Sequence, residues 1–180
     1  DQVGTVGNSV ENVGDARHHG MEFSSEIDLV GAYDHFQKTE WQKRLGSISP
    51  FVALTFLDAE FHEGPNEGRQ PAFAPKYNMR FGLNYNWRKK VKVSFLGTFL
   101  GDHFADDAST LTRKIPSYKV WDLTAEVNLF ENAFHLFGVT LFGGINNLFD
   151  ERYYARIRSD GIDPALERNL YGGVRIGVKF

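Results

Sequence analysis

The feature that most constrains the fold of this chain is a period-two alternation of apolar and polar residues in segments about ten residues long. Residues 77–87 show it most clearly and divide into two sets. The apolar or aromatic set is Tyr77, Met79, Phe81, Leu83, Tyr85 and Trp87. The other set is Asn78, Arg80, Gly82, Asn84 and Asn86. Because alternate residues of a strand point to opposite faces, the segment predicts a strand with one apolar and one polar face.

Strands with this length and pattern are typical of membrane barrels. A strand that crosses a bilayer needs about 9–11 residues, is apolar outward and polar inward, and carries aromatic residues at both interfaces. Residues 168–180 repeat the alternation. We therefore expect Tyr77, Met79, Phe81, Leu83 and Tyr85 to face outward, and Asn78, Arg80 and Asn84 to face inward. A soluble β-sandwich can show the same alternation and stays an alternative on this pattern alone.

The order of strands and connections favours an all-β, antiparallel, up-and-down transmembrane barrel. We predict about eight strands, the first of them truncated, near residues 1–8, 20–34, 46–61, 76–88, 90–105, 117–130, 134–148 and 168–180. Short connections are expected near 34–44, 87–91 and 130–134. Long polar loops are expected at 8–19, 62–75, 105–116 and 149–167. Short turns on one side and long loops on the other are the habit of such barrels. No stretch longer than a turn has a helical period, so essentially no helix is predicted.

Composition and motifs exclude several classes of function. The chain has 180 residues, no cysteine and a net charge of −3. Thiolate metal sites and disulfides are therefore excluded, and the basic run Arg88-Lys89-Lys90 is too short to predict nucleic-acid binding. No apolar run reaches the 18 residues of a membrane helix. The histidines lack metal-site spacing and no nucleophile motif occurs, so we expect no metal, no cofactor and no enzyme activity.

A group of arginines in the long loops is the candidate ligand-binding site. Arg156 and Arg158 lie in loop 149–167, Arg113 lies in the loop before it, and Arg69 lies one loop earlier. Guanidinium groups match the geometry of carboxylate and phosphate, so a mouth lined by them favours an anionic ligand. Solvated loop charges are the alternative. The acids that would then neutralise them are Asp150, Glu151, Asp160, Asp163 and Glu167.

Several motifs in fixed order resemble the carboxyl-terminal part of TonB-dependent outer-membrane receptors. The first is GINNLFDERYY at 144–154, and the second is ARHHGME at 16–22, preceded by Asn12 and Gly14. Others follow at 55–61, 74–76, 115–118 and 120–122. The stretch RSDGIDPALERN at 158–169 is most similar to the ferric-dicitrate-like branch of that family.

The resemblance implies a bacterial outer-membrane receptor for an iron chelate, either ferric citrate or a siderophore. Residues 1–180 would form a single segment of a barrel of roughly 22 strands. The outward face would contact outer-membrane lipid. The plug domain and the segment that contacts TonB would belong to an amino-terminal part with no counterpart in this sequence. Transport would be energised through TonB.

Two other functions stay open from the residues themselves. One is a standalone eight-stranded outer-membrane barrel with a structural or adhesion role. Its narrow interior would be filled by side chains. The inward set Arg80, Asn84, Lys92, Glu126 and Arg175 would then have to pair internally. The other is an outer-membrane enzyme or a soluble lipid carrier, which the absence of a recognisable nucleophile disfavours.

Overall fold

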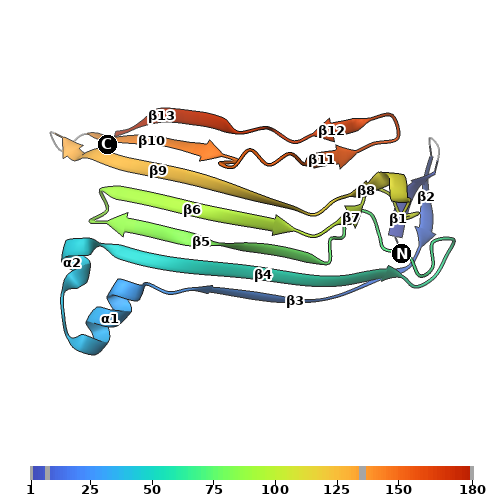
Figure 1. Ribbon diagram of the computed structural model, residues 1–180, viewed down its shortest axis with the longest axis horizontal. Coiled ribbons are helices and arrows are strands. Elements are labelled where there is room, and N and C mark those ends of the chain that lie inside the picture. Colours follow the sequence, from blue (N-terminus) through green and yellow to red (C-terminus); the bar gives the residue numbers. More distant parts are fainter. Residues whose placement is uncertain (1, 7–8, 134–136, 179–180) are drawn as a thin grey trace.

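The computed structural model describes residues 2–6, 9–133 and 137–178, and its main element is one antiparallel sheet (Figure 1). Its seven strands are β3 (Ala16–Glu26), β4 (Ser47–Phe61), β5 (Tyr77–Trp87), β6 (Val91–Leu100), β9 (Tyr118–Ala133), β10 (Phe137–Asn146) and β13 (Asn169–Val178). Their spatial order is β13-β10-β9-β6-β5-β4-β3. Each strand lies beside the sheet strand that precedes it in the chain, as the up-and-down pattern predicts.

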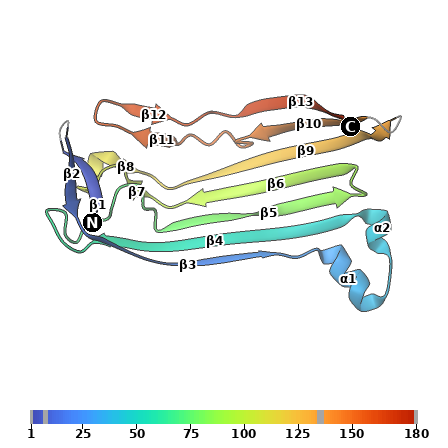
Figure 2. The ribbon, with the colours of Figure 1, turned by 180° about the vertical axis from the view of Figure 1, so that it is seen from behind.

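The sheet is open, with β3 and β13 at its two edges. A closed eight-stranded barrel would require these strands to pair, and they lie at opposite sides of the sheet (Figures 1 and 2). A strand is present within the predicted range 1–8, but it does not join the main sheet as the barrel prediction requires. That segment contains β1 (Gln2–Val6), which forms a separate hairpin with β2 (Ser9–Gly14) instead of joining the sheet. The loop expected at 8–19 is wrong for the same reason.

Three short strand pairs lie outside the main sheet, all at the end where the long loops gather. Besides β1–β2, they are β7 (His103–Phe104) with β8 (Lys114–Ile115), and β11 (Tyr154–Ile157) with β12 (Ile162–Pro164). A 3₁₀ turn, η1 (Leu111–Arg113), precedes β8. The strand predicted for 90–105 therefore ends at Leu100, and the turn predicted at 130–134 partly falls on residues outside the described ranges.

The expectation of no helix is wrong for the connection between β3 and β4. It contains α1 (Leu29–Gln37) and α2 (Trp41–Leu45). Asp28 caps α1 by accepting a hydrogen bond from the amide of Gly31 at 3.1 Å. Asp34 accepts bonds from Thr39 Oγ1 at 2.6 Å and from the amides of Trp41 and Gln42 at 2.9 and 2.8 Å. Desolvation acts to raise the pKa of Asp34, but the three hydrogen bonds together outweigh it and lower that pKa. No helix of the described residues is long and apolar enough to cross a membrane.

The two faces of the sheet differ as the alternation predicts. We call one the aromatic face, defined by Phe81, Phe95, Phe99 and Trp121. The ring of Phe81 lies 4.8 Å from that of Phe99 and 5.5 Å from that of Trp121, centroid to centroid. Trp121 also covers Gly97, where a Cβ atom would come within 2.8 Å of the indole. Glycine at 97 thus lets the large ring lie flat on the neighbouring strand.

The opposite side is the polar face, defined by Asn84, Ser94, Thr124 and Glu126. Asn84 and Ser94 are paired in register, and the Ser94 hydroxyl donates to the Asn84 amide oxygen at 2.8 Å. Asn84 also donates to Glu26 on β3 at 3.0 Å. The predicted placement of Phe81 and Asn84 on opposite faces is confirmed.

The buried apolar core does not lie under the sheet but at its long-loop end. Phe61, Pro71 and Ile115 are the largest fully buried side chains among the described residues. Many apolar residues of the sheet strands stay exposed instead, such as Leu170 at 77% and Met21 at 74%. A soluble protein buries such residues, whereas a membrane strand presents them to lipid.

Candidate functional site

The long loops gather at one end of the sheet, as predicted. Residues 62–76, 101–117 and 147–168 all lie there, together with the β1–β2 hairpin (Figures 1 and 2). The β5–β6 turn and the two helices lie at the opposite end. The candidate arginines of all three loops are therefore at the same end of the molecule.

Loops 62–76 and 101–117 are joined by hydrogen bonds into one unit. The amide of Phe73 donates to the carbonyl of Phe104 at 2.8 Å, and the amide of Ala72 donates to Asp107 at 2.9 Å. The Ser109 hydroxyl donates to the carbonyl of Gln70 at 3.1 Å. Phe61, directly before the first of these loops, and Ile115, within the second, are both fully buried. Such cross-linking fixes the loops more firmly than their polar sequences alone indicate.

Loop 147–168 is held at its base by Asn147, which is 3% exposed. The backbone N–H of Asn147 donates to the Asp122 carboxylate at 2.9 Å. The side-chain oxygen of Asn147 accepts a hydrogen bond from the backbone N–H of Glu151 at 2.8 Å. Its side-chain nitrogen donates to the carbonyls of Glu151 and Leu166 at 2.9 and 3.3 Å. Asn147 therefore ties both ends of the loop to β9. In the sequence this residue stands out only as part of a motif, and nothing in the motif indicates its role.

The segment after Asn147 turns sharply through left-handed backbone conformations. Asn147 has φ 53° and Asp150 has φ 58°, a region that asparagine and aspartate occupy more readily than other non-glycine residues. Asp150 also accepts a hydrogen bond from the amide of Arg168 at 2.9 Å. Asn147 and Asp150 of the NNLFD motif thus build the base of the loop.

The four candidate arginines differ in how far their charge is neutralised. Arg158 contacts Asp163 through two nitrogens at 2.9 Å, and Arg113 lies 3.6 Å from Asp106. Arg69 donates to the carbonyl of Ala108 at 3.1 Å and to Asn66 at 3.3 Å. Within the described residues, neither Arg69 nor Arg156 takes part in an ion pair. Of the acids expected to neutralise the arginines, Asp163 pairs with Arg158. Arg113 pairs with Asp106, which is not one of the expected acids.

The hairpin β11–β12 brings Arg156 and Arg158 to the same acid. Arg156 is directly opposite Asp163 in the register of the hairpin, and Asp163 is the ion-pair partner of Arg158. Arg156 is exposed. Strand β11 also contacts β8, which directly follows Arg113 in the chain. Arg113 and Arg156 therefore belong to neighbouring elements. Arg69 is linked to loop 101–117 by its hydrogen bond to the carbonyl of Ala108.

One aromatic contact connects loop 147–168 with β9, and one ion pair forms within loop 101–117. The ring of Tyr153 stacks on that of Tyr118 at 4.1 Å between centroids. Burial raises the pKa of Tyr153, and the negative charge of Asp122 raises it further. Lys114 pairs with Asp102 at 2.6 Å, and its hydrogen bond lowers the pKa of that carboxyl. Lys114 is thereby neutralised, whereas Arg69 and Arg156 have no ion-pair partner among the described residues.

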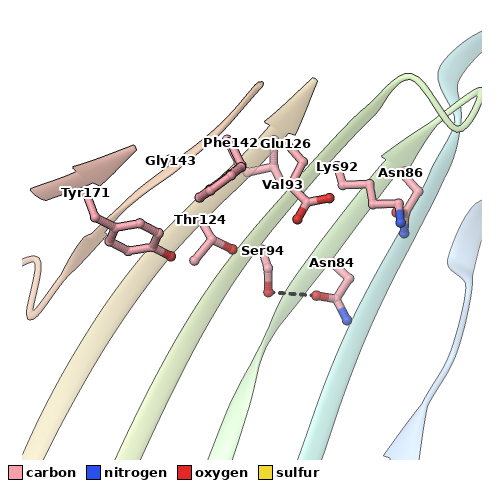
Figure 3. A pocket seen from close by; sticks show the side chains of 11 residues that line it. Asn84, Asn86, Lys92, Val93, Ser94, Thr124, Glu126, Phe142, Gly143 and Tyr171 are labelled. Carbon is pink, nitrogen blue, oxygen red and sulfur yellow. Dashed lines mark hydrogen bonds between the residues drawn. The ribbon is translucent and has the colours of Figure 1, made fainter. Parts of the chain in front are cut away.

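A second polar region is a hollow of about 520 Å³ on the polar face (Figure 3). Side chains from five strands line it, and the polar ones are Asn84, Asn86, Lys92, Ser94, Thr124, Glu126 and Tyr171. Lys92 and Glu126 are register partners. Arg175 approaches Glu126 at 3.5 Å and lies over the ring of Phe142 at 5.4 Å. Among the described residues there is no cluster of potential metal ligands.

Comparison with known proteins places this geometry in context. A profile of the family described as TonB dependent receptor-like, beta-barrel matches residues 1–148. The ferrioxamine receptor of Yersinia enterocolitica is 30% identical over 110 residues, which are 60% of this chain and 15% of that receptor. The metal-pseudopaline receptor CntO of Pseudomonas aeruginosa is 27% identical over 169 residues, which are 89% of this chain and 20% of the receptor.

Two solved structures of uptake proteins are also similar to this chain. The ferric citrate transporter FecA in its unliganded form matches with a TM-score of 0.73 and 25% identity, over 90% of this chain and 24% of that one. The ferric yersiniabactin uptake receptor FyuA of Yersinia pestis has a TM-score of 0.70 over 96% of this chain and 25% of that one. At 16% identity, the FyuA match shows the fold alone. This chain thus spans a quarter or less of the proteins it matches.

Proposed function

The chain belongs to the family of TonB dependent receptor-like β-barrels, and we propose that it forms the carboxyl-proximal strands of an outer-membrane receptor that takes up an iron chelate. The observation that carries this proposal is the two-faced sheet with cross-linked loops gathered at one end. The aromatic face would contact lipid and the polar face would line the interior of a larger barrel. The prediction that the chain is not an enzyme agrees with the matched proteins, which are receptors and transporters.

We further propose that the ligand is an anionic chelate, with ferric citrate as the first candidate. Support for an anion comes from Arg69 and Arg156, which bring positive charge to the loop end without an acidic partner in the described residues. Support for citrate comes from the likeness to FecA and from the 158–169 segment. Other matched receptors are named for ferrioxamine and metal-pseudopaline, so the family by itself does not select the chelate.

In this proposal, transport past the polar face is energised through TonB, by parts of the receptor that lie outside this chain. The hollow between Asn84 and Tyr171 would form part of the wall against which those parts rest. Its paired and hydrogen-bonded groups, such as Glu126 with Arg175, are satisfied without a ligand and so can serve as a polar wall. The chelate would first be captured by the loops at the opposite, arginine-bearing end.

The test is a titration of ferric citrate against the complete receptor and three variants. Arg156→Ala should weaken binding by about tenfold, because a charge-assisted hydrogen bond contributes about 1.5–3 kcal/mol and water competes at an exposed site. Arg158→Ala should also weaken it, since Asp163 is then left to neutralise Arg156. Asp163→Asn should tighten binding, because it frees both arginines. The differences should grow at low salt.

Asp163→Asn should change the affinity in the opposite direction to the two arginine variants. Loss of charge can therefore be distinguished from damage to the loop, which would weaken binding in all three variants. Lys89→Asn, at the other end of the molecule, is the matched control for removal of one exposed cation. Unchanged affinity in all the loop variants would mean that the arginines are solvated loop charges. A chelate without negative charge should bind equally well to wild type and to Arg156→Ala.

A further inference from the structure

The helical connection between β3 and β4 carries features that the receptor function does not use. It lies at the short-turn end, where a barrel of this kind needs only a turn. Instead, α1 and α2 form a small folded unit, ordered by the caps at Asp28 and Asp34. None of the residues of α1 or α2 is buried.

Helix α2 is fixed to the border of the aromatic face. The Tyr85 hydroxyl donates to the carbonyl of Leu45 at 2.9 Å, and the Trp87 indole donates to the carbonyl of Arg44 at 3.0 Å. Arg88 Nε donates to the carbonyl of Lys43 at 3.2 Å. Tyr85 and Trp87 have the same strand parity as Phe81, so they belong to the aromatic face. The carbonyl end of α2 is therefore held by the aromatic side chains that mark the edge of the lipid-facing surface.

An open apolar groove lies between the two helices. Its volume is about 400 Å³, and its lining residues are Leu29, Val30, Tyr33, Trp41 and Leu45. Leu29 and Tyr33 are 52% and 54% exposed, and Leu45 is 50% exposed. Contiguous apolar surface of this kind on a protein marks a contact with lipid or with another apolar partner.

A cationic hollow of about 330 Å³ adjoins the groove and shares Trp41 with it. It is lined by Lys43, Arg44 and Arg88 and by one acid, Glu40, which pairs with Lys43. Arg88 also lies over the ring of Trp87 at 5.1 Å. Lys89 and Lys90 add two more exposed cations in the same turn. The nearby acids Asp28 and Asp34 accept the hydrogen bonds of the helix caps and keep their charges. Together with Glu40 they are outnumbered by Lys43, Arg44, Arg88, Lys89 and Lys90, so the net charge of the rim is positive.

We propose that α1, α2 and the turn 88–90 bind an anionic phospholipid of the membrane leaflet at the short-turn end. An acyl chain would occupy the groove, and the phosphate would occupy the cationic hollow on the other side of Trp41. The ligand must be amphipathic because the two hollows are of opposite character and share one residue. Aromatic residues at the border and a basic cluster are the features by which a short helix lies in a membrane interface.

This inference rests on the membrane placement in the proposed function, but not on the identity of the chelate. The first experiment uses the complete receptor in vesicles, with Val30→Cys as the single cysteine, carrying a nitroxide label. The label should be accessible to oxygen and shielded from a water-soluble nickel chelate, and the shielding should increase from phosphatidylcholine vesicles to vesicles with one quarter phosphatidylglycerol. Access to nickel in both vesicles would overturn the proposal. Shielding from both reagents would mean that another protein segment covers the groove, and would also overturn it.

The second experiment counts phosphatidylglycerol that stays bound to the detergent-extracted receptor by native mass spectrometry. Arg44→Gln with Lys90→Gln should reduce the bound lipid roughly tenfold, since each cation near a lipid surface contributes measurably to binding anionic lipid. Both side chains are exposed, and in the described part of the chain only their backbone groups make hydrogen bonds, so the fold should persist. Arg69→Gln with Arg156→Gln is the matched control at the other end. Equal loss in both pairs, or no loss in either, contradicts the proposal. Ferric citrate affinity should stay unchanged in Arg44→Gln with Lys90→Gln, so the two proposals fail separately.

Discussion

At the scale of single residues, the polar side chains of the loop end fall into those that build the loops and those that are free to act. Asn147 belongs to the first group, since all its polar groups are used at the base of loop 147–168. Arg158 and Arg113 are held by acids. Arg156 belongs to the second group. A residue's place in a motif therefore does not show that it binds a ligand. Its hydrogen bonds and ion pairs are more informative, because they show which polar groups are already used.

Replacement of Asn147 should destabilise the loop base without touching the ligand site. Asn147→Ala removes three side-chain hydrogen bonds and puts alanine at φ 53°, so we expect a loss of about 3 kcal/mol or more in local stability. Limited proteolysis of the complete receptor in detergent should then cut within 151–167 much faster than in wild type. Asn146→Ala, which loses one bond to Asn169 at 2.9 Å, is the matched control. Equal cleavage of the two variants would contradict this role.

At the scale of elements, each strand of the sheet separates two environments. Phe81 lies among the rings of Phe99 and Trp121, whereas Asn84, three residues later, bonds to Ser94 and Glu26. The same strand thus contributes to both surfaces, and its residues differ only by parity. This makes β5 the best place to test which surface meets lipid.

Phe81→Arg should block assembly of the complete receptor in the membrane, whereas Asn84→Arg should be tolerated. A charge facing lipid near the middle of a bilayer costs about 2–4 kcal/mol, and the loss of the aromatic contacts adds to this. The measurement is the amount of folded receptor in isolated outer membranes. Equal damage from both substitutions would show that the aromatic face does not lie against lipid.

The strands could be predicted from sequence because alternation is local, but the helices could not. Ile27 and Leu29 continue the alternation of β3, and this hid the helical spacing of Leu29, Val30, Tyr33 and Phe36 after the cap at Asp28. In a segment this short both periods fit. The sequence predicts that the loops bearing the four arginines share one end of the sheet, as they do. The ion pairs of Arg158 and Arg113, however, depend on the β11–β12 hairpin and on the fold of loop 101–117. Neither could be read from the order of residues.

At the scale of the whole molecule, the buried apolar core of the described residues lies at the long-loop end of the sheet. Phe61, Pro71 and Ile115 support the long loops, while the middle of the sheet exposes apolar side chains on one face and polar ones on the other. Both edges, β3 and β13, are open. A sheet of this kind is stable when its edges pair with further strands and its apolar face meets lipid. The orientation of the two ends across the membrane is therefore central to the account.

Labelling of single cysteines on intact cells tests that orientation most directly. The 180-residue chain contributes no native cysteine, and any cysteine elsewhere in the complete receptor is first replaced by serine. Ser159→Cys in the β11–β12 turn and Lys89→Cys in the β5–β6 turn then introduce one reporter each. The account predicts that a membrane-impermeant maleimide labels Ser159→Cys of the complete receptor on intact cells. It predicts that Lys89→Cys is labelled only after the outer membrane has been permeabilised. Labelling of Lys89→Cys alone on intact cells, or of both positions before permeabilisation, would contradict the account.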